Sequence, residues 1–150
     1  KSLADYLSLK LWKPLQMEYA AKWSIDNKGI DKAFCCIHAI PRDFAIIGQL
    51  ILQQGQWQSQ QIFNKDFYDR MLAPTKENDA FGYSIWADDE SNVKSRFFYG
   101  FLGQFIIVIP EKDLIIVKTG FYNKLAVDEK KRPLQIKLLV EEITKLVAEL

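Results

Sequence analysis

The chain has 150 residues, which is enough for one domain and too few for two comfortable ones. Lys and Arg total 20 and Asp and Glu total 19, so the net charge of +1 favours neither nucleic acid nor an anionic membrane as a partner. Hydrophobic residues make up 49% and charged residues 26%, as in ordinary globular proteins and unlike disordered ones. The apolar runs are also far too short to span a membrane.

The chain is poor in metal ligands. Its one histidine, His38, and its two cysteines, Cys35 and Cys36, cannot form a tetrahedral zinc site without carboxylates. The cysteines are adjacent, so they offer no framework of loop-closing disulfides. We therefore expect no metal and no cofactor, and we interpret His38 as a hydrogen-bonded structural residue.

Capping and periodicity predict three helices in the first half of the chain. Ser2, with a carboxylate three residues later, is typical of a capping box, and Pro14 ends the helix that it begins. Pro41 opens a second helix whose apolar residues recur at helical spacing, and Gly55 is placed to cap its end. A third helix is predicted over 64–72.

After the third helix the pattern changes to that of strands and tight turns. The predicted strands span 81–86, 96–99, 104–109 and 114–117. The last two are apolar without alternation, which predicts that both of their faces are buried. A final helix can cover one face, but too little chain remains to cover the other face and both sheet edges. We therefore expect an α+β fold, an antiparallel sheet flanked by helices, that is one part of a larger folded unit.

The last third of the chain ends in a predicted amphipathic helix. A Lys-Lys-Arg cluster at 130–132 precedes it, and because Asp128 and Glu129 balance its charge, we predict a solvated loop. The helix follows Pro133. Its predicted apolar stripe consists of Leu139, Ile143, Leu146, Val147 and Leu150.

Four segments, in this order, carry a resemblance to a known family: SLADYL with WKPLQME, IPRDFAIIGQL, GQWQSQQI and GFLGQFIIVIP. Together they resemble the C-terminal part of the β-lactamase-related serine hydrolases. That group includes class C β-lactamases, penicillin-binding-protein-like esterases and 6-aminohexanoate-dimer hydrolases. The resemblance covers residues 2 to 119, and the last helix fits the C-terminal helix of the family. It implies that 1–150 is the C-terminal fragment of a single β-lactamase-like domain.

The resemblance implies an acyl-transfer enzyme. In the family, a Ser three residues before a Lys supplies the nucleophile and its base, and a Tyr assists proton transfer. Both motifs lie upstream of the segment that begins here at Ser2. We therefore expect these groups from the remaining N-terminal part of the same protein. Members of the family are often exported, which is the sole ground for expecting a periplasmic or extracellular location.

Two stretches imitate catalytic motifs of the family, and we reject both. Ser91 and Lys94 have the Ser-x-x-Lys spacing but lie in a polar turn, where an exposed Lys keeps too high a pKa to act as a base. Lys118-Thr119-Gly120 spells the third motif of the lactamases, Lys-Thr-Gly. It follows the strand at 114–117, and we assign it to the wrong end of the hairpin.

The counterpart of the third motif should precede the strand at 104–109, at Phe98-Tyr99-Gly100. The lactamases have Lys where Phe98 stands, which favours an esterase, amidase or peptidase. Gly100 allows the backbone to approach an acyl group closely. The resemblance implies that the next residue, Phe101, donates its backbone N–H to the oxyanion hole. Alternatively, Gly100 and Gly103 only mark a bulge in a central strand.

The candidate substrate-pocket residues are Phe98, Tyr99, Tyr83 and Trp86. Tyr83 and Trp86 lie three residues apart in a predicted strand, so only one of them can face the pocket unless a bulge intervenes. Core packing is the alternative for both.

These observations predict part of a serine hydrolase that acts through an acyl-enzyme on a small-molecule ester, amide or β-lactam. Two alternatives stay open. The first is a non-catalytic binding or scaffold module of the same fold that has lost the nucleophile. The second is an independent small α+β domain. A Ser-x-x-Lys at a helix start upstream, followed by Tyr-x-Asn, would favour the enzyme over the scaffold.

Overall fold

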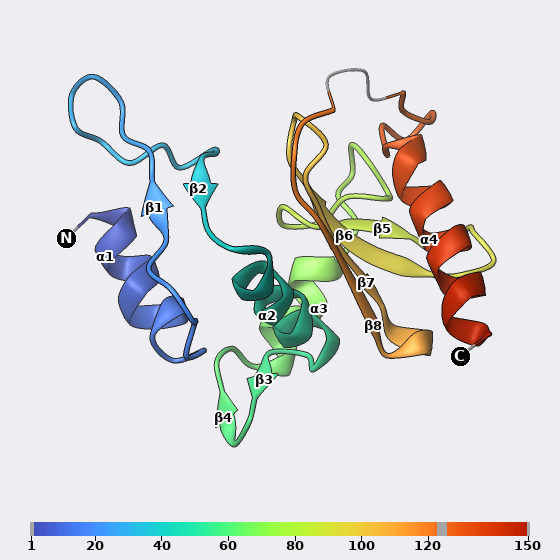
Figure 1. Cartoon of the computed structure of the whole chain (residues 1–150), viewed down its shortest axis with the longest axis horizontal. Coiled ribbons are helices and arrows are strands. Elements are labelled where there is room, and N and C mark those ends of the chain that lie inside the picture. The colour runs from blue at the N-terminus through green and yellow to red at the C-terminus, as the bar shows by residue number, and fades with distance from the viewer. Residues whose placement is uncertain (1, 123–125, 150) are drawn as a thin grey trace.

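The computed structural model describes residues 2–122 and 126–149 (Figure 1). A four-stranded antiparallel sheet, ordered β5-β6-β7-β8, lies between α4 on one side and α2 and α3 on the other. The elements are α1 (Leu3–Leu7), a π-helical segment (Ser8–Trp12), β1 (Lys22–Trp23), β2 (Ile37–His38), α2 (Pro41–Leu52), β3 (Gln56–Trp57), β4 (Gln60–Gln61), α3 (Lys65–Leu72), β5 (Trp86–Asp88), β6 (Ser95–Tyr99), β7 (Phe105–Ile109), a 3-10 turn (Pro110–Lys112), β8 (Leu114–Lys118) and α4 (Leu134–Ala148).

The first three helices begin where their caps predict. The Ser2 hydroxyl accepts the Asp5 N–H at 3.0 Å, and the Asp5 carboxylate accepts the Ser2 N–H at 3.2 Å, which completes a capping box. Asn64 caps α3 by accepting the Phe67 N–H at 2.9 Å. α2 ends at Leu52, and Gly55 just beyond it has a φ of 87° and donates its N–H back to the Leu50 carbonyl at 2.8 Å. Local signals therefore set these boundaries.

Successive residues of a strand face opposite sides, and the sheet therefore separates two apolar cores. The core under α4 consists of Phe97, Phe105, Ile107, Ile109, Ile116, Ile136 and Val140. The core that joins α2 and α3 to the other face consists of Ile51, Met71, Ile85 and Val108. Both faces of β7 are thus buried, as predicted, whereas in β8 (Leu114–Lys118) only Ile116 is buried and the other residues are half-buried, contrary to prediction. The expectation that too little chain remains to cover the second face is wrong, because α2 and α3 cover it.

The first strand of the sheet is shorter and later than predicted. The expected strand at 81–86 is wrong, because β5 begins only at Trp86, and Phe81 makes one isolated bridge. The residues between them form a turn in which Ser84 has a φ of 60°. The Tyr83 N–H donates to the Met71 carbonyl at the end of α3 at 2.8 Å, and this contact takes the segment away from the sheet.

The buried face of α4 also differs from the predicted stripe. Ile136, Val140 and Thr144 are buried, and Leu139 and Ile143 pack partly against the core. Leu146 and Val147 are exposed, contrary to prediction, and Leu150 lies outside the described residues. Leu146 lies about 200° around the helix from Thr144, which turns it away from the sheet.

The Lys-Lys-Arg cluster is only in part the predicted solvated loop, because Lys131 is exposed but Arg132 is buried. Arg132 is 4% exposed, and its guanidinium donates to Asp128 at 2.7 Å, Asp88 at 3.0 Å and Glu90 at 2.8 Å. The Lys130 ammonium lies 2.6 Å from Glu90. Two of these carboxylates follow or end β5, more than forty residues earlier in the chain. Neighbouring sequence alone does not reveal such partners.

Over the described residues, no helix has the length and apolar character needed to cross a bilayer.

Candidate functional site

The candidate oxyanion donor lies in the loop 100–104, which joins β6 to β7. The Gly100 N–H donates to the Gln104 carbonyl at 2.8 Å, and the Gly103 N–H donates to the Gly100 carbonyl at 2.9 Å. Gly103 has a φ of 80°, a conformation that favours glycine. The two glycines therefore close a hairpin. The alternative of a bulge within a central strand is wrong.

Phe101 stands at the exposed part of this loop. Its side chain is 90% exposed. Within the described part of the chain, its backbone N–H donates to no acceptor. A backbone N–H that has no internal partner is open to an external acceptor, such as water or a substrate oxygen. The loop can therefore present a backbone donor to a ligand.

Gly100 leaves room for the side chain of Gln104. A Cβ at this position would lie 2.6 Å from the side-chain oxygen of Gln104. The Gln104 amide nitrogen in turn donates to the Gly120 carbonyl at 2.7 Å and to the Leu102 carbonyl at 3.3 Å. The small size of Gly100 thus lets the Gln104 side chain lie across the base of the loop and connect it to the segment after β8.

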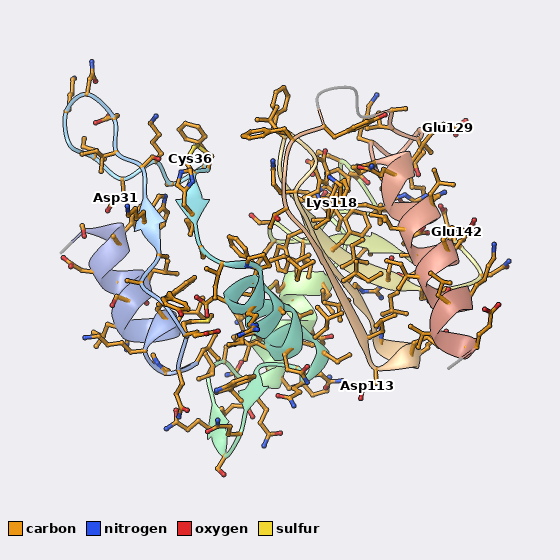
Figure 2. The ribbon with its side chains drawn as sticks, in the orientation of Figure 1. Asp31, Cys36, Asp113, Lys118, Glu129 and Glu142 are labelled. Atoms are coloured by element: carbon orange, nitrogen blue, oxygen red, sulfur yellow. A yellow bond between two sulfur atoms is a disulfide. The ribbon has the colours of Figure 1, made fainter. Side chains whose placement is uncertain are left out.

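Lys118 lies at the end of the sheet that carries the loop 100–104. Its predicted place at the opposite end of the hairpin is therefore wrong. It pairs with Phe105 in the β7–β8 register, and its Nζ donates to the Gly103 carbonyl at 2.7 Å. Figure 2 shows Lys118 at one end of β8 and Asp113 near the other. An antiparallel strand returns to the end at which its partner began, so the tight turn at 110–113 alone could have placed Lys118 beside the loop.

A second segment contacts the loop from the same side. The Tyr122 N–H donates to the Leu102 carbonyl at 2.7 Å, and a Cβ on Gly103 would lie 3.0 Å from the Tyr122 Cβ. Phe121, the neighbour of Tyr122, is 83% exposed. The loop therefore has a fixed base and an open outer side.

The structure brings together two of the four candidate pocket residues. The rings of Trp86 and Tyr99 lie 5.4 Å apart and pack against the core under α4. Phe98 faces the opposite side of the sheet, where it packs with the core of α2 and α3. Tyr83 is 60% exposed in the turn before β5. The four side chains thus lie in three different settings.

The remaining candidate residues have structural partners. The ring Nε2 of His38 lies 3.2 Å from the Ser24 hydroxyl, in keeping with a hydrogen-bonded structural role. Cys35 and Cys36 form a disulfide with each other, which closes no loop (Figure 2 labels Cys36). Ser91 donates to Asp88 at 2.7 Å within a turn, as expected for the rejected motif. Within residues 2–122 and 126–149, no three His, Cys, Asp or Glu side chains gather as metal ligands.

One solved structure that this chain resembles is described as "Putative 6-aminohexanoate-dimer hydrolase from Bacillus anthracis". The two superpose with a TM-score of 0.71 and share 22% sequence identity, over 99% of this chain and 38% of the other. The chain therefore shares the α+β fold of the matched part of that structure. It spans little more than a third of the length of that hydrolase-like neighbour. No family profile and no curated protein matches the sequence.

Proposed function

We propose that this chain supplies the oxyanion-binding side of the active site of a serine hydrolase, which cleaves an ester, amide or β-lactam through an acyl-enzyme. The proposal assigns the nucleophilic Ser, its Lys and the assisting Tyr to sequence outside these 150 residues. The observation that carries it is the unpartnered N–H of Phe101 in an exposed loop at the end of the sheet. The hydrolase-like fold supports the same conclusion.

The role of Phe101 follows from the chemistry of acyl transfer. When a Ser oxygen attacks the substrate carbonyl, the proposed Lys takes the proton of the Ser hydroxyl, a new C–O bond forms, and the π electron pair of the carbonyl moves onto its oxygen. The Phe101 N–H and the N–H of the nucleophile donate hydrogen bonds to that oxygen. Collapse of the intermediate expels the alcohol or amine, to which the same proton is given, and water then hydrolyses the acyl-enzyme. A preorganised donor of this kind stabilises the transition state by about 3 kcal/mol.

We also propose that Tyr83, the one exposed side chain among the four candidate pocket residues, contacts the acyl group of the substrate. Trp86 and Tyr99 pack under α4 and Phe98 packs on the opposite face of the sheet, so the four side chains do not line one pocket. Phe98 and Tyr99 directly precede Gly100, and Tyr83 and Trp86 lie at or before β5. Because Phe98 stands where the lactamases carry a Lys, we favour esters, amides or peptides as substrates over β-lactams that carry a carboxylate. Of the four side chains, Tyr83 is the most accessible to a ligand, at 60% exposure.

The first test is covalent labelling of the full-length protein. A fluorophosphonate should add one adduct mass to the intact protein, and a penicillin probe tests the lactam arm of the proposal. Peptide mapping should place the adduct on a Ser outside these 150 residues. If neither probe nor a panel of p-nitrophenyl esters reacts, the scaffold alternative replaces the enzyme.

The second test separates the N–H of Phe101 from its side chain. Phe101→Pro removes the backbone donor, whereas Phe101→Ala keeps the donor and removes only an exposed ring. In full-length protein, we expect Phe101→Pro to lower kcat for a p-nitrophenyl ester by about 10²-fold or more, the typical loss for an oxyanion donor. Phe101→Ala should stay within a few-fold of wild type. Equal activity of the two variants would contradict the assignment.

A further inference from the structure

We propose that Lys118 is a positioning residue for the oxyanion donor. Its ammonium holds the loop 100–104 through the Gly103 carbonyl, so that the Phe101 N–H is already in place when negative charge develops on the substrate oxygen. The proposal rests on the proposed function, because it concerns the same loop. It gives a role to Lys118, the last residue of β8.

The contact itself is short and charge-assisted. The Lys118 Nζ lies 2.7 Å from the Gly103 oxygen and 5.4 Å from the centroid of the Phe105 ring. Gly103 is two residues from Phe101, and its φ of 80° is part of the hairpin turn. Hydrogen bonds from a charged donor are about twice as strong as neutral ones. The side chain of Lys118 therefore fixes the turn at a point adjacent to the proposed donor.

No carboxylate of residues 2–122 or 126–149 competes for the charge of Lys118. Among the carboxylates that the structure describes, none lies within ion-pair distance of this ammonium. Lys130, by contrast, is paired with Asp79 and Glu90. An unneutralised cation beside a loop that presents backbone N–H groups adds positive potential where a transition-state oxyanion forms. Lys118 thus holds the loop through a hydrogen bond and also adds positive electrostatic potential at the proposed oxyanion site.

Gln104 provides a second, neutral tether to the same loop. Its amide nitrogen bridges the Leu102 and Gly120 carbonyls at 3.3 and 2.7 Å. This bond links the loop to the end of β8 without adding charge. Removal of Lys118 should therefore leave the hairpin closed but less firmly oriented, which lowers the rate of acylation rather than unfolding the protein.

The experiment compares three variants of the full-length protein. Lys118→Met removes the ammonium and keeps the apolar stem, Lys118→Arg restores a cation, and Lys112→Met removes an exposed cation from the 3-10 turn at the other end of the β7–β8 hairpin. The assays are the acylation rate constant and KM for a p-nitrophenyl ester, and the inhibition constant of a boronic acid, whose tetrahedral anion imitates the oxyanion intermediate. Thermal melting reports on folding.

We expect Lys118→Met to slow acylation and weaken boronic-acid binding by about tenfold each, with KM within about twofold of wild type, because only the charged oxygen uses the donor. Lys118→Arg should recover most of both losses, and Lys112→Met should match wild type. If Lys118→Met melts far below wild type, Lys118→Gln, which keeps a neutral donor, is used instead and should lose about as much boronic-acid affinity.

The outcomes distinguish this inference from the proposed function. If wild type neither reacts with the fluorophosphonate nor hydrolyses any ester, the proposed function fails. If wild type is active and a folded Lys118→Met or Lys118→Gln variant keeps its acylation rate and boronic-acid affinity within twofold, the role of Lys118 is overturned while the enzyme stands. A parallel rise in KM for Lys118→Met and Lys118→Arg would also overturn it, since that pattern reports ground-state binding.

Discussion

The Arg132 guanidinium is 5% exposed and faces three carboxylates, Asp88, Asp128 and Glu90, from two parts of the chain. Removing a charge from water costs several kcal/mol, and only close, complete hydrogen bonding offsets that cost. Here the guanidinium donates at 2.7 to 3.0 Å to all three partners. The network joins the start of α4 to the turn between β5 and β6. Loss of Arg132 would leave Asp88, itself 5% exposed, as a buried carboxylate without a cationic partner, and of the described groups only Ser91 and the Glu90 N–H would still donate to it.

We expect Arg132→Met to lower the free energy of unfolding by about 3 kcal/mol near neutral pH, the usual cost of breaking a buried ion pair on one side. Lys145→Met is the matched control, because Lys145 and Glu142 form an exposed pair at 66% exposure each. Pairs of that kind contribute about 0.5 kcal/mol or less. Urea unfolding of the full-length variants measures both. Equal losses for the two variants would contradict a stabilising role for the buried network.

Because of the same network, the difference in unfolding free energy between wild type and Arg132→Met should depend on pH. Hydrogen bonds from Lys130 and then Arg132 hold the pKa of Glu90 below its usual range. Burial raises the pKa of Asp128, but hydrogen bonds from Arg132 more than offset this and lower it overall. Carboxyls with a depressed pKa stabilise the fold above their ordinary pKa, and this contribution is lost as pH falls through the folded-state value. The difference between wild type and Arg132→Met should therefore shrink below about pH 4.

At the scale of elements, Gly48 allows α2 to pack closely against the sheet. A Cβ at Gly48 would lie 2.7 Å from the Cγ2 of Ile115 and 3.2 Å from the Cγ2 of Ile106. Both contacts are with branched, stiff side chains near their backbone, so neither can yield easily. Glycine weakens a helix interior by about 1 kcal/mol relative to alanine, yet here it permits the close approach of α2 to β7 and β8.

Gly48→Ala should therefore destabilise the protein by about 1 kcal/mol, because overpacking costs about 1–3 kcal/mol and the gain in helix propensity offsets only part of it. Ile115→Ala removes the obstructing methyl group at a cost of its own. In the double variant the two losses should be less than additive by at least about 0.5 kcal/mol, which urea unfolding can measure. Full additivity would show that the two residues do not compete for space.

Elements with local signals could be predicted, and elements that depend on distant partners could not. Asn64 caps α3, and Gly55 donates to a carbonyl in the last turn of α2, through contacts within a few residues. The strand expected at 81–86 fails because Tyr83 bonds to Met71 on another element. The loop 100–104 was found through its resemblance to a family, whereas its contact with Lys118 required the strand register. A site built across a sheet is visible in the sequence only after the pairing of its strands is known.

At the scale of the whole molecule, the two edges of the sheet are unequal. The β5 edge is partly covered, because the Ala87 N–H donates to the Ala80 carbonyl at 2.8 Å and Phe81 bridges Trp86. No strand among the described residues pairs with the outer edge of β8. β8 has the sequence Leu-Ile-Ile-Val-Lys, and an uncovered apolar edge is a template for another strand. We therefore propose that further sequence of the same protein covers this edge.

The isolated 150-residue chain tests that proposal. Its open β8 edge, together with α1, which buries none of its residues, should make the chain associate as concentration rises. Size-exclusion chromatography should give an apparent mass above that of the 17.4 kDa monomer, and near-UV circular dichroism should show a broad thermal transition. Full-length protein, with the edge covered, should melt sharply and independently of concentration. A cooperative monomer of the 150-residue chain would instead establish an independent domain, since such a chain needs no partner for its sheet.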